Sequence, residues 1–252
     1  MRRLLPSPHD ESLSDVYGDL VLTGAVDGRS GVSLGMVSSV DGGATVAGRT
    51  ADLGGDADQS AFAALRASTD AILVGAGTVQ VEDYGPATGS LERRKRRVAK
   101  GLAASPRLVI VSNRLSLSAD ARVFADPDHP PLLVTSEQGV AARPEVAARG
   151  EVLVCGASAV DLVVALEGLA SRGLGRVLCE GGPGLNASLF GQDLVDEVFL
   201  TVAPTLIGGD APRIISPGDG HGPRPLALVA LREHRSELLL HYRVVRPPAD
   251  RL

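Results

Sequence analysis

The stretch Leu178-Cys-Glu-Gly-Gly-Pro-Gly-Leu-Asn-Ala-Ser-Leu-Phe190 lies between two apolar segments. The run from Arg176 to Cys179 is typical of a short buried strand, and the segment that begins at Leu185 is typical of a helix. Glycines in the turn between them let a ligand approach the backbone closely, and a helix N-terminus attracts anions. The stretch therefore predicts a strand–turn–helix unit whose turn is a candidate pyrophosphate cradle, formed by Gly181, Gly182, Gly184 and Leu185.

The same alternation of strand and helix extends along the chain. Short apolar runs predict strands at 32–40, 71–74, 108–111, 132–135, 152–155, 176–179 and 198–202. Apolar residues at helical spacing predict helices at 12–17, 56–68, 139–148, 159–172 and 185–192. Residues 234–245 alternate in the manner of an antiparallel edge strand, and residues 82–105 are predicted to be irregular. This order is typical of an α/β fold with a mostly parallel sheet, an antiparallel C-terminal edge and helices on both faces.

Composition narrows the class of protein. The chain has 252 residues, 44% of them hydrophobic, and a net charge of −5, which disfavours a general nucleic-acid binder. The basic run at 93–97 is interpreted as a solvated loop or helix face. We find no signal peptide and no run long enough to span a membrane, so a cytoplasmic protein is expected.

Cysteine and histidine give no sign of a metal site. Cys155 and Cys179 each follow an apolar run and are predicted to be free and buried, and two thiols without clustered histidines do not make a structural zinc site. The histidines are scattered and are predicted to lie on the surface. They are His9, His129, His221, His234 and His241. No metal is expected.

Three turns that follow predicted strands carry glycines and acids. They are Ser38-Ser-Val-Asp-Gly-Gly43, Gly75-Ala-Gly-Thr-Val79 and Glu180-Gly-Gly-Pro-Gly184. In open α/β sheets ligands bind beyond the carboxyl ends of strands, so we expect the three turns to meet at one edge. None has the Rossmann fingerprint, because Gln80 stands where its third glycine belongs. Any one turn alone is more often a plain connection than a ligand site.

Two acids are candidates for chemistry. Glu180 is placed to accept hydrogen bonds from a substrate amide or ring N–H, although an acid there is also a common helix-capping partner. Asp83 follows the second glycine turn and is a candidate general acid or substrate anchor. Its alternative role is to cap the turn.

An ordered set of motifs resembles a known family. The motifs are Ser39-Val-Asp-Gly42, Asp70-Ala-Ile-Leu-Val-Gly-Ala-Gly-Thr-Val79, Glu180-Gly-Gly182, Leu194-Val-Asp-Glu-Val198, Ala203-Pro204 and Gly208-Gly209. In this order and spacing they resemble the reductase domain of bacterial riboflavin biosynthesis, which has a dihydrofolate reductase-like fold. The resemblance covers about residues 31–246 and implies one reductase domain there, with residues 1–30 as an N-terminal extension.

The resemblance implies an enzyme that uses NADPH to reduce the ribosyl group of 5-amino-6-(5-phosphoribosylamino)uracil to a ribityl group. It also implies a homodimer. The implied cofactor contacts are Gly75, Gly77 and Thr78 in one turn, Gly181 and Gly182 in a second, Ser39, Asp41 and Gly42 near the nicotinamide, and Ser112 and Arg114 near the 2′-phosphate. Asp83 is implied to anchor the substrate or deliver a proton, and Glu180 to face the bound pair.

The chain departs from the family pattern on the substrate side. The family's first-strand lysine is missing near Gly35, and its Asp-Asp-Pro is Glu82-Asp-Tyr84 here. The Thr-Val-Arg that helps to hold the substrate phosphate is replaced by Pro86-Ala-Thr-Gly89. Two alternatives therefore stay open, a reductase of the same fold that acts on a pterin or dihydrofolate, and a non-catalytic nucleotide-binding paralogue. Because the family's deaminase motif is absent, another chain is expected to carry out deamination.

Overall fold

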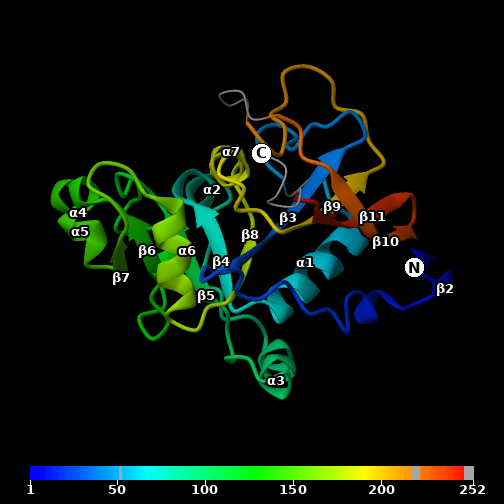
Figure 1. The fold of residues 1–252 in the computed structure, drawn as a ribbon, viewed down its shortest axis with the longest axis horizontal. Helices are drawn as coiled ribbons and strands as arrows, with labels where there is room; N and C mark the ends of the chain where they lie inside the picture. Colours follow the sequence, from blue (N-terminus) through cyan, green and yellow to red (C-terminus); the bar gives the residue numbers. More distant parts are fainter. Residues whose placement is uncertain (51–52, 217–221, 247–252) are drawn as a thin grey trace.

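The computed structural model describes residues 1–50, 53–216 and 222–246, so His221 lies outside the described residues. Its centre is one eleven-stranded sheet in the order β2-β1-β10-β11-β9-β3-β8-β4-β5-β6-β7. Helices lie on both faces (Figure 1). The α/β class and the mostly parallel sheet are confirmed.

The strands from β9 to β7 in this order are all parallel. They are β3 (Gly31–Ser39), β4 (Ala71–Gly75), β5 (Arg107–Val111), β6 (Leu132–Thr135), β7 (Glu151–Val154), β8 (Arg176–Cys179) and β9 (Glu197–Ala203). Because neighbouring strands run the same way, the turns after β3, β4 and β8 lie at one edge of the sheet. The prediction that the three glycine turns share an edge is confirmed.

The other end of the sheet is antiparallel. It contains β10 (Leu226–His234), β11 (Glu237–Val244), β1 (Arg2–Leu5) and β2 (His9–Asp10). The predicted antiparallel C-terminal edge is confirmed, and within it β11 lies between β10 and β9 while the N-terminal strands β1 and β2 are outermost. The sequence of β1 has no alternation of apolar and polar residues. Residues 2–5 nevertheless form a strand, because they pair with main-chain N–H and C=O groups along the edge of β10.

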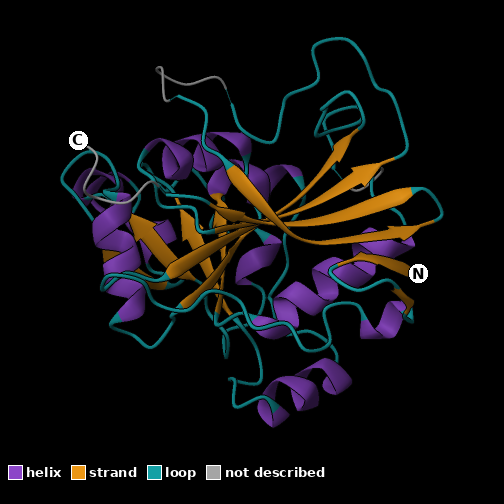
Figure 2. Ribbon diagram, turned by 45° about the vertical axis from the view of Figure 1, so that its right-hand side comes forward, coloured by secondary structure: helices purple, strands orange, loops and turns teal. Residues whose placement is uncertain are grey.

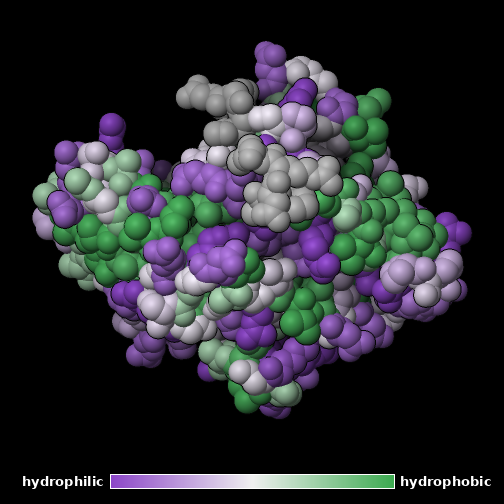
Figure 3. Space-filling view, in the orientation of Figure 1, coloured by the Kyte–Doolittle hydropathy of each residue, from purple (hydrophilic) through white to green (hydrophobic). Residues whose placement is uncertain are grey.

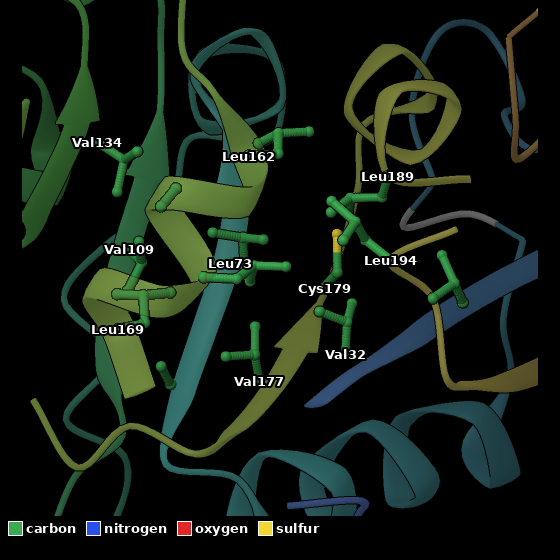
Figure 4. Close-up of a cluster of buried hydrophobic side chains, with 14 of the residues drawn as sticks. Val32, Leu73, Val109, Val134, Leu162, Leu169, Val177, Cys179, Leu189 and Leu194 are labelled. Carbon is green, nitrogen blue, oxygen red and sulfur yellow. The ribbon is translucent and has the colours of Figure 1, made fainter. Parts of the chain in front are cut away.

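Two helices, α6 (Leu162–Ala170) and α7 (Pro183–Gly191), cover one face of the parallel strands. Figure 4 shows the apolar core beneath them, where Leu73, Val177 and Cys179 point toward Leu169 and Leu189. The opposite face is covered by α1 (Asp56–Ser68), α2 (Ala76–Val81) and α5 (Pro144–Ala147), and α5 follows α4 (Glu137–Ala142). Cys155 and Cys179 are free and buried, as predicted.

Residues 91–99 form a helix, α3 (Leu91–Ala99), so the prediction of an irregular segment there was wrong. Ser90 caps α3 by accepting a hydrogen bond from the Arg93 N–H, a local signal of a helix start that the charge of the run obscures. The helix projects away from the sheet (Figure 2). The side chain of Arg97, a residue of α3 itself, is buried. It donates to the carbonyls of Arg66 and Thr69, so the basic run is not entirely solvated.

The N-terminal extension and His241 belong to the core. Val16 and Tyr17, which follow the 3-10 turn η1 (Leu13–Asp15), pack with α1. His241 is buried and stacks on Phe199 with ring centroids 4.1 Å apart, which corrects its predicted surface position. Its burial follows from the alternation of β11, since every second residue of that strand faces α1.

Candidate functional site

Two adjoining cavities lie beside the segment that follows α2, and the glycine turns after β4 and β8 line one of them. The first, here called the glycine cavity, has a volume of about 500 Å³ and contains Gly75, Gly77, Thr78, Glu180, Gly182, Gly184 and Leu185 in its wall. The second, here called the α1 cavity, has a volume of about 560 Å³ and lies between α1 and the segment after α2. Both are lined by Val37, Thr50, Phe62, Glu82 and Tyr84. Ligands bound in the two cavities would meet at this shared wall.

The glycine cavity depends on close backbone contact between two turns. The Gly75 N–H donates to the Gly181 carbonyl at 2.8 Å. A Cβ atom at Gly182 would lie 2.5 Å from the Thr78 hydroxyl oxygen, which is closer than real Cβ contacts. Gly181 has φ of 89°, in the left-handed region that favours glycine. A side chain at Gly182 would therefore collide with Thr78 in the wall of the cavity.

The N-terminus of α7 opens into this cavity. Gly182 is its N-cap, Pro183 is the first helical residue, and no side chain caps the helix. The N–H groups of Gly184 and Leu185 therefore have no partner within the helix. Donors at a helix N-terminus suit a pyrophosphate, so the residues present fit the nucleotide predicted from the sequence.

Glu180 is the buried carboxylate at the junction. Arg66 donates to both of its oxygens, with Nε to Oε1 and Nη2 to Oε2 each at 2.6 Å, and the Tyr84 hydroxyl donates to Oε2 at 2.7 Å. Burial lowers the pKa of Arg66, but the hydrogen bonds and charge of Glu180 outweigh it and leave that pKa above its usual value. Burial, followed by the Glu180 charge, raises the pKa of Tyr84 well above its usual value. Tyr84 is thus a neutral donor at ordinary pH.

Tyr84 stands where the family's Asp-Asp-Pro motif has its proline, and its main-chain N–H explains why proline is absent here. Glu82 is the C-cap of α2, Asp83 has φ of 48°, and the Tyr84 N–H donates to the Val79 carbonyl at 3.0 Å. This is a Schellman ending, in which the residue at position 84 must supply an N–H. Proline has none, so the departure from Asp-Asp-Pro is coupled to this helix ending. The Glu82 carboxylate in turn accepts from the N–H and hydroxyl of Thr50.

Asp83 lies at the exposed rim of the α1 cavity. Its carboxylate Oδ2 is 2.9 Å from Nε of Arg122, in the 3-10 turn η2 (Arg122–Phe124), and Nη2 of Arg122 donates to the Asp83 carbonyl. The pair places a second arginine in the wall of this cavity. No local pattern pointed to Arg122, because η2 is distant from Asp83 along the chain.

The turn after β3 is held by its own hydrogen bonds. The Ser39 hydroxyl donates to Asp41 at 2.5 Å, and Asp41 accepts from the N–H groups of Ile207 and Gly208. The Ser39 hydroxyl, followed by these N–H groups, lowers the pKa of Asp41 to about 2. Ser39, Asp41 and Gly42 are not among the described residues that line either cavity.

Ser112 and Arg114 follow β5, next to the strand that ends at Gly75. The Ser112 hydroxyl accepts from the Ser116 N–H at 3.1 Å, and Arg114 is exposed with no ion pair within the described part of the chain. Neither lines the two cavities. Their proposed contact with a 2′-phosphate stays a prediction.

One face of α1 was missed as part of the site. Asp58, Phe62 and Arg66 are spaced by four residues and all line the α1 cavity, whereas Ala61 and Leu65 face the core. The signal was present in the predicted helix at 56–68, where an acid, an aromatic ring and an arginine recur at i, i+4 and i+8. Apolar spacing alone does not reveal it.

Within residues 1–50, 53–216 and 222–246, no group of three or more His, Cys, Asp or Glu side chains is placed to hold a metal ion. Over the same residues, no helix has the length and apolar character required to cross a bilayer.

Known proteins are similar to this chain in sequence and in fold. The 2,5-diamino-6-ribosylamino-4(3H)-pyrimidinone 5′-phosphate reductase of Archaeoglobus fulgidus is 36% identical over 151 residues, which are 60% of this chain and 69% of that relative. The reductase of the same name from Methanothermobacter thermautotrophicus is 32% identical over 193 residues, covering 76% and 86%. The crystal structure of a pyrimidine reductase-like protein from Corynebacterium diphtheriae has a TM-score of 0.81 at 27% identity, covering 94% of this chain and 100% of that one.

The family profile named RibD C-terminal domain matches residues 31–239. The match begins where β3 begins and leaves residues 1–30 outside it. It includes both glycine turns, Glu180 and the α1 face. The chain is an oxidoreductase that belongs to the RibD C-terminal domain family.

Proposed function

We propose that this protein uses NADPH to reduce the ribosyl group of a riboflavin-precursor pyrimidine phosphate to a ribityl group. The observation that carries the proposal is the meeting of the glycine cavity and the α1 cavity at Tyr84. Such a junction places a nucleotide on one side and a small substrate on the other. Family membership and the names of two curated relatives support this reaction.

The glycine cavity is the proposed NADPH site. The N–H groups of Gly184 and Leu185 would bind the pyrophosphate, and Arg114 would lie toward a 2′-phosphate, which distinguishes NADPH from NADH. NADPH supplies a hydride when it is bound. The chain's own task is to hold the acceptor carbon in place and to exclude water from the junction, where Phe62 and Val37 line both cavities.

The α1 cavity is the proposed substrate site. Arg66 and Arg122 are the cations in its wall, and they are the candidates to bind the substrate phosphate. Asp83 anchors the substrate by orienting Arg122 toward it. Glu180 already accepts three hydrogen bonds from Arg66 and Tyr84, so it acts by fixing the Tyr84 hydroxyl at the junction.

We place the enzyme in the cytoplasm as a homodimer. One face of β9, β10 and β11 is apolar and half-buried or exposed, with Val198, Leu200, Leu226, Leu228 and Leu240 on it. Apolar side chains gather over this part of the molecule in Figure 3. A second copy that covers this face would remove it from water.

The test is NADPH oxidation by the purified protein, followed by absorbance. The substrates are the 2,5-diaminopyrimidinone ribosyl phosphate, its deaminated uracil counterpart and dihydrofolate. Oxidation with a ribosylaminopyrimidine but not with dihydrofolate is expected. Oxidation with dihydrofolate alone would assign a pterin substrate, and tight NADPH binding without oxidation by any of the three would assign a non-catalytic paralogue.

A further inference from the structure

The segment 204–216, here called the strap, runs from the end of β9 to the start of α7 and forms part of the glycine cavity. Pro212 of the strap lines that cavity, and its carbonyl accepts from the N–H of Ala44 at 2.7 Å. The strap contains no helix or strand of its own, so its course depends on the groups that hold it. It also contains Pro204 and Gly208-Gly209, motif residues for which the reaction described above has no use.

The first anchor of the strap is Asp41, in the turn after β3. Its carboxylate accepts from the N–H groups of Ile207 and Gly208, and Oδ2 lies 2.7 Å from the Gly208 nitrogen. Gly208 and Gly209 have φ of 67° and 63°, in the left-handed region, so glycine suits the turn that presents these donors. Asp41 lines neither cavity, and its contacts place it in the support of the wall rather than in the wall itself.

The second anchor is Asn186, which is fully buried in α7. Its Nδ2 donates to the Ile214 carbonyl at 2.7 Å, and its Oδ1 accepts from the Cys179 thiol at 3.4 Å. A carbonyl can only accept, so the amide has one orientation here, and its loss would leave that carbonyl without its partner. The Ser216 N–H donates to the Pro183 carbonyl at 3.1 Å, which adds a main-chain contact at the same end of the strap.

We propose that Asp41 and Asn186 are positioning residues that fix the strap at both ends, so that the turn after β3 and the N-terminus of α7 hold a dinucleotide as one unit. The inference rests on the proposed function, in which the dinucleotide is NADPH. A segment without regular structure loses conformational freedom when both of its ends are fixed. Release of either end restores that freedom, and a ligand that needs the strap in place must then bear the entropy of ordering it.

A double-variant cycle tests the coupling between the two anchors. Asp41→Asn keeps the side-chain shape but turns a donor toward the N–H groups of the strap, and Asn186→Leu keeps the side-chain size but removes the donor. Each single variant should raise the Kd of NADPH about fivefold. The double variant should bind about as weakly as either single variant, because one free end already releases the strap.

Independent sites that lie apart would instead multiply their effects. A double variant whose loss of affinity equals the product of the two single losses would therefore overturn the proposal. Single variants that bind NADPH as tightly as the wild type would overturn it as well.

ADP shows whether the effect crosses the cavity. It carries the pyrophosphate that is proposed to bind at α7, but it has no nicotinamide. We expect Asp41→Asn to raise the Kd of ADP by about the same factor as the Kd of NADPH, because the released strap no longer supports α7. If Asp41→Asn weakens NADPH binding and leaves ADP binding unchanged, Asp41 acts on the nicotinamide half alone and the coupling is rejected.

The control is Asp210→Asn. Asp210 is exposed and lies between the two anchored parts of the strap, so the substitution removes the same charge from the strap without releasing either end. Its Kd values for NADPH and ADP should match those of the wild type. Weakening equal to that of Asp41→Asn would assign the effect to net charge and contradict the anchoring role.

Hydrogen exchange in the ligand-free protein separates this inference from the proposed function. In Asp41→Asn the amide of Ser216 should exchange at least about tenfold faster than in the wild type, and in Asn186→Leu the amide of Gly208 should do the same. Each of these amides lies at the end of the strap opposite the substitution. Faster exchange only at the substituted end would overturn the proposal. Faster exchange at the opposite end in a protein that does not bind NADPH would keep the coupled anchors and reject the proposed function.

Discussion

Arg66 forms two hydrogen bonds to Glu180, each at 2.6 Å, across 114 positions of sequence. The Glu180 side chain is 2% exposed, so Arg66 takes the place of the water that would otherwise solvate its carboxylate. Loss of one member of a buried pair is more costly than loss of both, because the remaining charge has no counterion.

We therefore expect Arg66→Met to lower the free energy of unfolding by about 3 kcal/mol, at the lower end of the range for buried pairs, since the Arg66 side chain is 36% exposed. Arg66→Met combined with Glu180→Gln should recover part of the loss. Urea unfolding of the two single variants and the double variant measures the coupling. A coupling near zero would show that the Arg66–Glu180 pair adds nothing to the free energy of unfolding.

Gly182 tests the nucleotide cradle. A larger side chain there would collide with Thr78 and narrow the glycine cavity, so Gly182→Val should weaken NADPH binding by at least about tenfold. Fluorescence titration of NADPH is the measurement. Gly24→Ala is the control, because a Cβ at Gly24 meets nothing within 4 Å. Unchanged NADPH affinity in a folded Gly182→Val variant would reject the cradle.

Asp83 tests the substrate end. Asp83→Asn removes the charge that orients Arg122, so kcat/KM for the pyrimidine should fall about tenfold while the Kd of NADPH stays unchanged. Asp120→Asn, an exposed acid that precedes η2, is the matched control. Parallel losses of turnover and NADPH binding would place Asp83 elsewhere in the site.

The buried acid Asp58, in the first turn of α1, predicts how the free energy of unfolding depends on pH. The Asp58 pKa is about 6 in the folded state against an ordinary value of 3.8, so the folded state binds the proton more tightly than the unfolded state. Stability contributed by this group is complete below about pH 4 and is lost as pH rises to about 6, by on the order of 2–3 kcal/mol. Asp58→Asn should therefore be more stable than the wild type near pH 8 and equal to it near pH 4. The measurement is the urea midpoint of the wild type and of Asp58→Asn at both pH values. A difference between the two proteins that is the same at both pH values would contradict the raised pKa of Asp58.

The apolar face of β9, β10 and β11 predicts the oligomeric state. Leu228 is 42% exposed there, and Leu228→Glu should convert a dimer to a monomer in light scattering after gel filtration. Val164 on α6 is similarly exposed, at 46%, and lies outside this face, so Val164→Glu should leave the dimer intact. A wild-type protein that is monomeric in this measurement would contradict the proposed homodimer.

Local patterns predicted the elements that carry their own signal. The apolar run at Ala71–Val74 and the glycine turn after Cys179 both fold as expected, because burial and turn chemistry act within a few residues. Strand β1 and the Arg122–Asp83 pair had no such signal, because their partners lie far away in the chain. The same holds for the candidate site. Its glycines could be predicted from the sequence, whereas its pairs of charged residues could not.

Glu237 completes the first turn of α1, although it follows Gly55 by 182 positions. During synthesis α1 leaves the ribosome long before that carboxylate does, since chains emerge at about 5–20 residues per second. The start of the helix that carries Asp58 is thus held by β11, a strand made long after α1. The first turn of α1 lacks its capping carboxylate until β11 has been made, and a chain that stops before β11 never gains it.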